Sequence, residues 1–234
     1  MTDHAALVTS QFGSRAAAYV ASADHAKGAD LGDIAQAIGV IADAWVLDLG
    51  CGGGHASFAA APHARAVIAT DLSAEMVAAV SAEAARRGLR NLTTQVCAVA
   101  ALPFSDASFD VVMSRLSAHH WTDIGAGLRE ARRVLKPGGL GIFIDVIGSD
   151  DPHRDTWFQT IELLRDPSHV RNYSPSDWRA LLQDAGFTPG DVRPHTIRLD
   201  FKTWTDRMNT PEVHRQAMRS LQACMPADVA AYLK

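Results

Sequence analysis

Residues 46–54 read Val46-Leu47-Asp48-Leu49-Gly50-Cys51-Gly52-Gly53-Gly54, an apolar run that leads directly into a glycine-rich loop. A dinucleotide-binding fingerprint requires the pattern G-x-G-x-x-G at the turn from a strand to a helix. The third glycine of that pattern would fall at position 55, which is His55. The glycines stand instead at 50, 52 and 54, preceded by Asp48. This spacing disfavours a nicotinamide dinucleotide site.

Short apolar runs alternate with helix-like stretches along most of the chain, and this alternation is typical of a mainly parallel sheet. Their nearly continuous apolar character fits central strands that helices cover on both faces. Right-handed crossovers then build a doubly wound α/β sheet. The predicted strands are Trp45–Leu49, Ala66–Thr70, Leu92–Cys97, Phe109–Ser114 and Leu140–Val146.

The sequence indicates where two of the predicted helices begin and end. Ser73 can cap the first, in which Met76, Val77, Val80 and Ala84 recur at helical spacing before Gly88. Asp123 opens the second, which the sequence Lys136-Pro137-Gly138-Gly139 stops.

The chain is predicted to form one domain, with a helical cap over residues 1–40 and a cofactor-binding core over 44–147. A helical insertion over 148–186 is expected on the substrate side, followed by C-terminal strands and helices over 187–234. Phe187–Val192 and Thr196–Phe201 fit a strand pair around Pro194 or one longer strand. No closing strand precedes Lys234, which leaves a sheet edge that a second subunit could cover in a homodimer.

The composition excludes several classes of function. With 47% hydrophobic residues and a formal net charge of −4, the chain can bury a core and has no electrostatic drive towards nucleic acid or anionic membranes. Its three cysteines, Cys51, Cys97 and Cys224, lie far apart and fit neither a disulfide framework nor a metal site. No leader or membrane-spanning run is recognised, so a cytoplasmic location is expected.

Functional residues are expected at the carboxyl ends of the strands, because ligands of open parallel sheets bind where the strand order reverses. The loop Gly50-Cys51-Gly52 lets a ligand approach the backbone and leaves helix N–H groups free for a carboxylate. Asp71 ends the second strand, where a carboxylate can accept hydrogen bonds from both hydroxyls of a ribose. Both features fit an adenosyl ligand; the alternative is a tight turn with a helix-capping aspartate.

Four stretches together resemble the class I S-adenosylmethionine-dependent methyltransferases, in the methyltransferase type 11 family related to the ubiquinone and menaquinone C-methyltransferases. The resemblance covers about residues 20–200 and implies a Rossmann-like fold, S-adenosyl-L-methionine as cofactor and S-adenosyl-L-homocysteine as product. The stretches are residues 46–54, Asp71-Leu72-Ser73 with Met76, Leu102-Pro103-Phe104 with Phe109-Asp110, and Arg133-Val134-Leu135-Lys136-Pro137-Gly138-Gly139.

The resemblance also assigns residues to parts of the cofactor. It implies that the glycine loop approaches the methionyl part, that Asp71 holds the ribose and that Leu72 and Met76 line the adenine. Ser114 and Arg115 would then lie near the transferring methyl group. The expected cofactor-binding residues are Asp48, Gly50, Cys51, Gly52, Asp71, Leu72, Met76, Val99, Ala100, Ser114 and Arg115.

One position departs from the family pattern. Before Leu-Pro-Phe the family usually has Gly-Asp-Ala-Glu, whose aspartate can accept from the adenine amino group, whereas this chain has Ala98 at that place. The backbone N–H of Val99 and apolar packing remain available to read the adenine.

Two histidine-containing stretches carry the predictions for catalysis and substrate binding. His119 and His120 follow the fourth strand and are candidates for a base or for positioning the acceptor, the alternative being one packed and one solvated ring. Asp145 is a second candidate base or a turn cap. Chelation of a metal is disfavoured because adjacent helical residues point about 100° apart.

The predicted insertion and the N-terminus supply further candidates. His169, Arg171 and Tyr173 can anchor a polar or anionic substrate, or else belong to a solvated loop. Near the N-terminus, Phe12, Tyr19 and His25 form either a lid over the cofactor or part of the core.

These patterns predict an enzyme that moves a methyl group from S-adenosylmethionine to a small-molecule acceptor by in-line displacement. The base-stacking stretch that nucleic-acid amino-methyltransferases carry after the fourth strand is replaced by Ser114-Arg115-Leu116-Ser117, which argues against DNA or RNA. The alternative is a protein that binds the cofactor as a sensor or structural element without catalysis.

Overall fold

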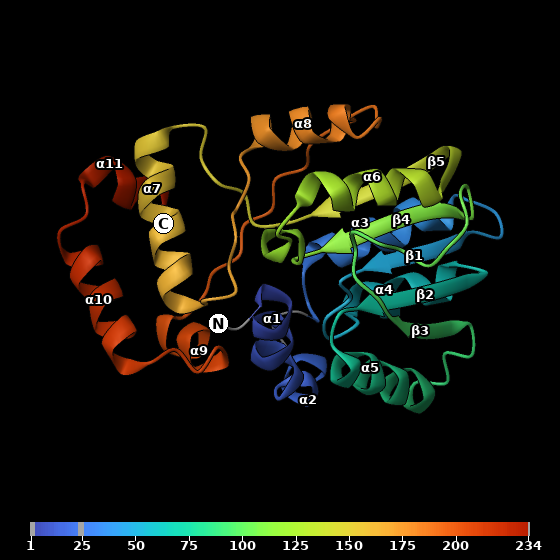
Figure 1. Cartoon of the computed structure of the whole chain (residues 1–234), viewed down its shortest axis with the longest axis horizontal. Coiled ribbons are helices and arrows are strands. Elements are labelled where there is room, and N and C mark those ends of the chain that lie inside the picture. Colours follow the sequence, from blue (N-terminus) through green and yellow to red (C-terminus); the bar gives the residue numbers. More distant parts are fainter. Residues whose placement is uncertain (1–2, 23–25, 234) are drawn as a thin grey trace.

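The computed structural model, which describes residues 3–22 and 26–233, contains a five-stranded parallel sheet, seen in the right half of Figure 1. The strand order is β3-β2-β1-β4-β5, and every neighbouring pair is parallel. Because β1 lies between β2 and β4, the strand order reverses at β1. The strands are β1 (Trp45–Leu49), β2 (Ala66–Asp71), β3 (Leu92–Val96), β4 (Phe109–Arg115) and β5 (Leu135–Ile144).

Two apolar cores cover the two faces of this sheet, because successive side chains of a strand point to opposite faces. Along β1, Val46 joins one core, whereas Leu47 and Leu49 join the other. The first core contains side chains of α3 (Ala29–Gly39), α4 (His55–Ala60) and α5 (Ala74–Arg86), and the second contains those of α6 (Ile124–Val134) and α8 (Pro175–Asp184). The doubly wound α/β fold predicted from the sequence is therefore confirmed.

Side-chain caps fix the predicted helix starts. The Ser73 hydroxyl accepts from Met76 N–H at 3.2 Å, and Asp123 accepts from Ala126 N–H at 2.7 Å. At the other end of α6, the strand β5 begins at once with Leu135, five residues before the predicted start at Leu140. The extra residues pair irregularly with β4, since the register shifts between Phe109 and Val111.

The remaining helices lie beside the carboxyl ends of the strands. Figure 1 shows α1 (His4–Gly13) and α2 (Ala16–Val20) between the sheet and a group of helices made of α7 (Pro152–Arg165), α9 (Phe201–Arg207), α10 (Glu212–Ala223) and α11 (Ala227–Tyr232). Pro211 and Pro226 are the N-cap residues of α10 and α11. No helix within the described ranges is long and apolar enough to cross a membrane.

The strand pair predicted for Phe187–Val192 and Thr196–Phe201 is wrong, because residues 187–200 form no helix or strand. Phe187 packs against Phe143 of β5 with ring centroids 5.5 Å apart, but Val192 and Ile197 stay exposed and no buried face forms. Asp200 caps α9 by accepting from Thr203 N–H at 2.9 Å. Phe201 consequently starts a helix and does not end a strand.

Candidate functional site

A cavity of about 250 Å³ opens at the carboxyl ends of β1, β2 and β4, beside the point where the strand order reverses. This is the place at which open parallel sheets bind ligands. The glycine loop and the ends of β2 and β3 line one part, and the segment after β4 together with α1 lines the other. The lining residues are His4, Ala5, Val8, Phe12, Tyr19, Asp48, Gly50, Cys51, Gly52, Gly53, His55, Ala56, Thr70, Asp71, Leu72, Met76, Cys97, Ala98, Val99, Ala100, Arg115, Leu116, Ser117, His120, Trp121, Thr122 and Asp123.

The glycine loop needs glycine for different reasons at different positions. Gly50, Gly52 and Gly54 have φ values of 64°, 49° and 77°, in the left-handed region that side chains disfavour. A Cβ at Gly52 would meet nothing within 4 Å, so the space above it is open, whereas one at Gly50 would overlap Ser117 Oγ. The loop thus presents bare backbone to the cavity.

Asp48 lies beneath this loop with a fully buried carboxylate that lines the cavity. Its Oδ2 accepts from the Ser57 hydroxyl at 2.6 Å, but its Oδ1 has no hydrogen-bond partner within the described residues. Burial raises the pKa of Asp48 to about 6, despite the Ser57 hydrogen bond. An orphaned carboxylate oxygen of this kind suits a cationic group, such as the ammonium of an amino acid.

Asp71 is held rigidly at the end of β2. Its Oδ2 accepts from Gly52 N–H at 3.0 Å and its Oδ1 accepts from Ser73 N–H at 2.9 Å. Burial raises the pKa of this carboxyl. Each oxygen keeps a further lone pair, so the carboxylate can accept from two neighbouring hydroxyls of a ribose.

Apolar side chains surround the cavity beyond Asp71. Met76 is buried, and Leu72, Ala98 and Val99 line the same part of the wall. The faces of a flat aromatic ring such as adenine can pack against such walls, and Ala98 supplies no carboxylate for its amino group.

Arg115 and Ser114 end up in different surroundings at the end of β4. Arg115 lines the cavity and forms a nearly buried ion pair with Asp30 of α3. Ser114 donates its hydroxyl proton to Leu49 O at 2.9 Å and does not line the cavity. Among the eleven predicted cofactor-binding residues, the cavity therefore brings together all except Ser114.

The N-terminal helices form a wall that the sequence only partly revealed. Ala5, Val8 and Phe12 of α1 line the cavity with apolar surface, and His55 Nε2 donates to the Tyr19 carbonyl at 2.9 Å. The lid alternative for Phe12 and Tyr19 therefore agrees with their positions, whereas His25 lies outside the described residues. The helical spacing of Ala5, Val8 and Phe12 is a signal that could have indicated this wall.

His119 and His120 lie on a short 3-10 turn after β4 and face different surroundings. His119 Nδ1 lies 2.6 Å from Asp145 Oδ1, and His119 is absent from the cavity lining. Burial lowers the pKa of His119, but the Asp145 carboxylate more than offsets it, so the net pKa is raised. His120 lines the cavity, and burial lowers its pKa well below the usual range. Both residues are partly buried.

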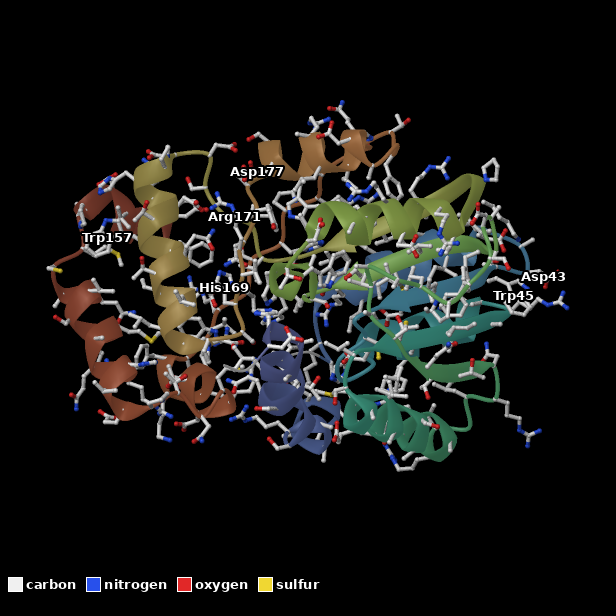
Figure 2. All side chains as sticks on the ribbon, viewed as in Figure 1. Asp43, Trp45, Trp157, His169, Arg171 and Asp177 are labelled. Atoms are coloured by element: carbon white, nitrogen blue, oxygen red, sulfur yellow. The ribbon has the colours of Figure 1, made fainter. Side chains whose placement is uncertain are left out.

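The cavity does not include the three predicted substrate residues. His169 is buried and bonds Gln159 Oε1 at 2.8 Å, and Arg171 pairs with Asp155 at 2.9 Å. Figure 2 shows His169 and Arg171 beside α7, far from Asp43 and Trp45 at the start of β1. Tyr173 packs near Trp178 of α8, with ring centroids 6.2 Å apart.

The described residues contain no group of three or more His, Cys, Asp or Glu side chains that could hold a metal ion. The acidic and basic side chains that line the cavity are those of His4, Asp48, His55, Asp71, Arg115, His120 and Asp123.

Known proteins are similar to this chain in both sequence and architecture. The family described as a methyltransferase domain matches residues 47–143. The uncharacterized protein YafE of Escherichia coli is 45% identical over 76% of this chain and 86% of its own length. The uncharacterized methyltransferase YcgJ of Bacillus subtilis is 35% identical over 80% of this chain and 74% of its own.

The crystal structure of YcgJ superposes with a TM-score of 0.84 and 30% identity, covering 87% of each chain. A probable S-adenosylmethionine-dependent methyltransferase of Mycolicibacterium smegmatis is 33% identical over 63% of this chain and 53% of its own.

Proposed function

The chain belongs to the S-adenosylmethionine-dependent methyltransferases, and we propose that its methyl acceptor is a small molecule bound between the end of β4 and α1. When bound, the cofactor supplies an electrophilic methyl group on a sulfonium. The observation that carries this proposal is the single continuous cavity, which runs from Asp71 and the glycine loop to Phe12 and His120. It offers room for a cofactor part and an acceptor part in one space.

We assign the cofactor part to residues whose chemistry matches it. The unpartnered Oδ1 of Asp48 would hold the ammonium of the methionyl part, and the bare backbone at Gly52 would lie against the same part. Asp71 would accept from the ribose hydroxyls. Met76 and Leu72 would pack on the adenine.

The acceptor part offers apolar surface and few polar groups. Ala5, Val8 and Phe12 of α1 and Leu116 and Trp121 after β4 supply the apolar surface, and His4 and Asp123 line the same cavity. Methyl transfer from a sulfonium is an in-line displacement, and holding the acceptor against the methyl group while excluding water supplies much of the acceleration. An apolar wall of this kind provides both effects.

Binding of the cofactor tests the first part of the proposal. The melting temperature of the protein should rise with S-adenosylmethionine and S-adenosylhomocysteine and stay unchanged with NAD. Stabilisation by NAD alone would contradict it. Asp110→Asn, at the opposite end of the sheet, serves as a variant that should keep the adenosyl response.

Turnover tests the second part. Purified protein, S-adenosylmethionine and a panel of small acceptors should yield S-adenosylhomocysteine with at least one of them. Release of product with a protein or oligonucleotide acceptor alone would contradict the assignment of a small molecule. Binding without product from any acceptor would favour the sensor alternative.

A further inference from the structure

We propose that His120 accepts a hydrogen bond from the methyl acceptor through Nε2, and that Asp166 is a positioning residue that fixes this ring through Ser168. The inference rests on the proposed function, because it concerns the acceptor part of the same cavity. It names the class of acceptor: an uncharged molecule with an O–H or N–H group on an apolar frame.

The hydrogen bonds of His120 determine which ring nitrogen carries the proton. Its Nδ1 lies 3.0 Å from the Ser168 carbonyl oxygen, and a carbonyl oxygen can only accept. The Ser168 hydroxyl, 3.4 Å from the same nitrogen, already donates to Asp166 Oδ1 at 2.6 Å. Nδ1 therefore carries the proton, and in a neutral ring Nε2 is left with a lone pair.

The surroundings keep this ring neutral. Burial lowers the pKa of His120, and the neighbouring His119, His169 and Arg165 all act in the same direction. From α1, His4 Nε2 lies 3.1 Å from the His120 carbonyl oxygen and donates to it. No carboxylate is paired with the His120 ring among the described residues, whereas His119 has Asp145.

We infer that Nε2 lies on the cavity side of the ring. His120 lines the cavity, and its Nδ1 is directed at Ser168, which does not line it. Phe12 packs edge-on against the ring with centroids 5.0 Å apart, which limits its rotation. Within the described residues, Nε2 makes no hydrogen bond. It is thus available to accept one from a ligand.

Apolar walls around His120 select an uncharged ligand. Val8, Phe12, Leu116 and Trp121 line the same cavity as His120, and Phe12 contacts its ring. The guanidinium of Arg115 is already paired with Asp30, so it does not compensate a ligand carboxylate in full. A neutral donor on an apolar frame satisfies Nε2 without burying an unpaired charge.

Asp166 acts on His120 from outside the cavity. Its carboxylate is 1% exposed, and its Oδ1 accepts from both Ser168 N–H, at 2.9 Å, and the Ser168 hydroxyl. These two bonds hold the loop after α7 so that the Ser168 carbonyl faces Nδ1. Asp166 does not line the cavity.

Nitrogen-15 NMR of the histidine side chains tests the tautomer without any acceptor. His120→Gln identifies the signals, which should show Nδ1–H and an unprotonated Nε2 at pH 7. Asp166→Ala should mix the tautomers, whereas Asp166→Asn, which keeps an accepting oxygen, should preserve the wild-type signals. An Nε2–H tautomer, an imidazolium or no change in Asp166→Ala would overturn the assignment.

Phenol, anisole and benzoate, added to protein saturated with S-adenosylhomocysteine, test the ligand class. Phenol should bind about threefold to tenfold more tightly than anisole, which lacks the donor, and more tightly than anionic benzoate. His120→Phe should remove the preference for phenol over anisole. Equal binding of phenol and anisole to the wild type, or tighter binding of benzoate, would refute the proposal.

The affinity for S-adenosylhomocysteine separates failure of this inference from failure of the proposed function. It should be the same in the wild type, Asp166→Ala and His120→Phe, because these residues lie outside the cofactor part. Normal affinity together with the wrong tautomer would refute only the role of His120. Absence of binding to the wild type would refute the proposed function itself.

Discussion

Replacing Asp48 with asparagine should stabilise the protein without cofactor and weaken its binding of cofactor. The Asp48 carboxylate is fully buried, and burial raises its pKa from 3.8 to about 6. A shift of about 2 units means that ionised Asp48 costs the folded state about 3 kcal/mol at pH 7. Asparagine removes this charge and keeps an oxygen for the Ser57 hydroxyl.

The net gain is smaller than this cost, because an amide nitrogen would stand where Oδ1 has no partner. An unsatisfied amide offsets up to about 2 kcal/mol, so we expect Asp48→Asn to raise the free energy of unfolding by about 1 to 3 kcal/mol. Because the pKa of Asp48 is raised in the folded state, Asp48 becomes protonated below about pH 6, and the wild-type protein then loses the free-energy cost of a buried charge. The advantage of the variant should therefore shrink by about 1 kcal/mol at pH 5.

Cofactor binding should change in the opposite direction. Loss of a charge-assisted hydrogen bond to the ammonium should weaken S-adenosylhomocysteine binding at least about tenfold, as measured by isothermal titration calorimetry at pH 7. Urea unfolding of the same samples gives the stability. Asp110→Asn is the matched control: it breaks the 2.8 Å ion pair with Lys136, so it should destabilise the protein and leave binding unchanged. An Asp48→Asn variant that is less stable than the wild type, or that binds normally, would refute the reasoning.

Three further substitutions test the cofactor site, the glycine loop and the cap of α8. Asp71→Ala should weaken S-adenosylhomocysteine binding at least about tenfold in calorimetry, because both ribose hydrogen bonds are lost; unchanged affinity would mean that the ribose lies elsewhere. Gly50→Ala should lower the melting temperature, since its Cβ would overlap Ser117 Oγ at a φ of 64°, and the double variant with Ser117→Gly should recover part of the loss. Ser174→Ala should cost about 1 kcal/mol in urea unfolding by removing the capping box of α8, with no effect on binding.

The parts of the fold and site that could be predicted are those that depend on neighbours in sequence. Asp71 could be placed because it ends an apolar run, and Ser73 because a hydroxyl three residues before Met76 caps a helix. The glycine positions likewise follow from local backbone requirements. Local patterns therefore predicted many of the residues that line the cavity.

The remaining parts depend on contacts between distant segments. Which of His119 and His120 lines the cavity is decided by Asp145, twenty-six residues away from His119, and by Ser168, forty-eight residues away from His120. Ile197, Leu199 and Phe201 alternate as in a strand, yet Ile197 and Leu199 are exposed and Phe201 begins α9. Local spacing cannot indicate such partners.

Gly53 differs from its neighbours in the glycine loop. A Cβ there would lie 2.6 Å from the carbonyl oxygen of Tyr19, whereas Gly50, Gly52 and Gly54 are required by their own left-handed backbone. Two different constraints therefore require glycine in this loop. One is the left-handed backbone of the turn, and the other is the close contact with α2. Relatives that lack α2 should tolerate alanine at position 53 while keeping the other three glycines, so their divergence would record the loss of the helix.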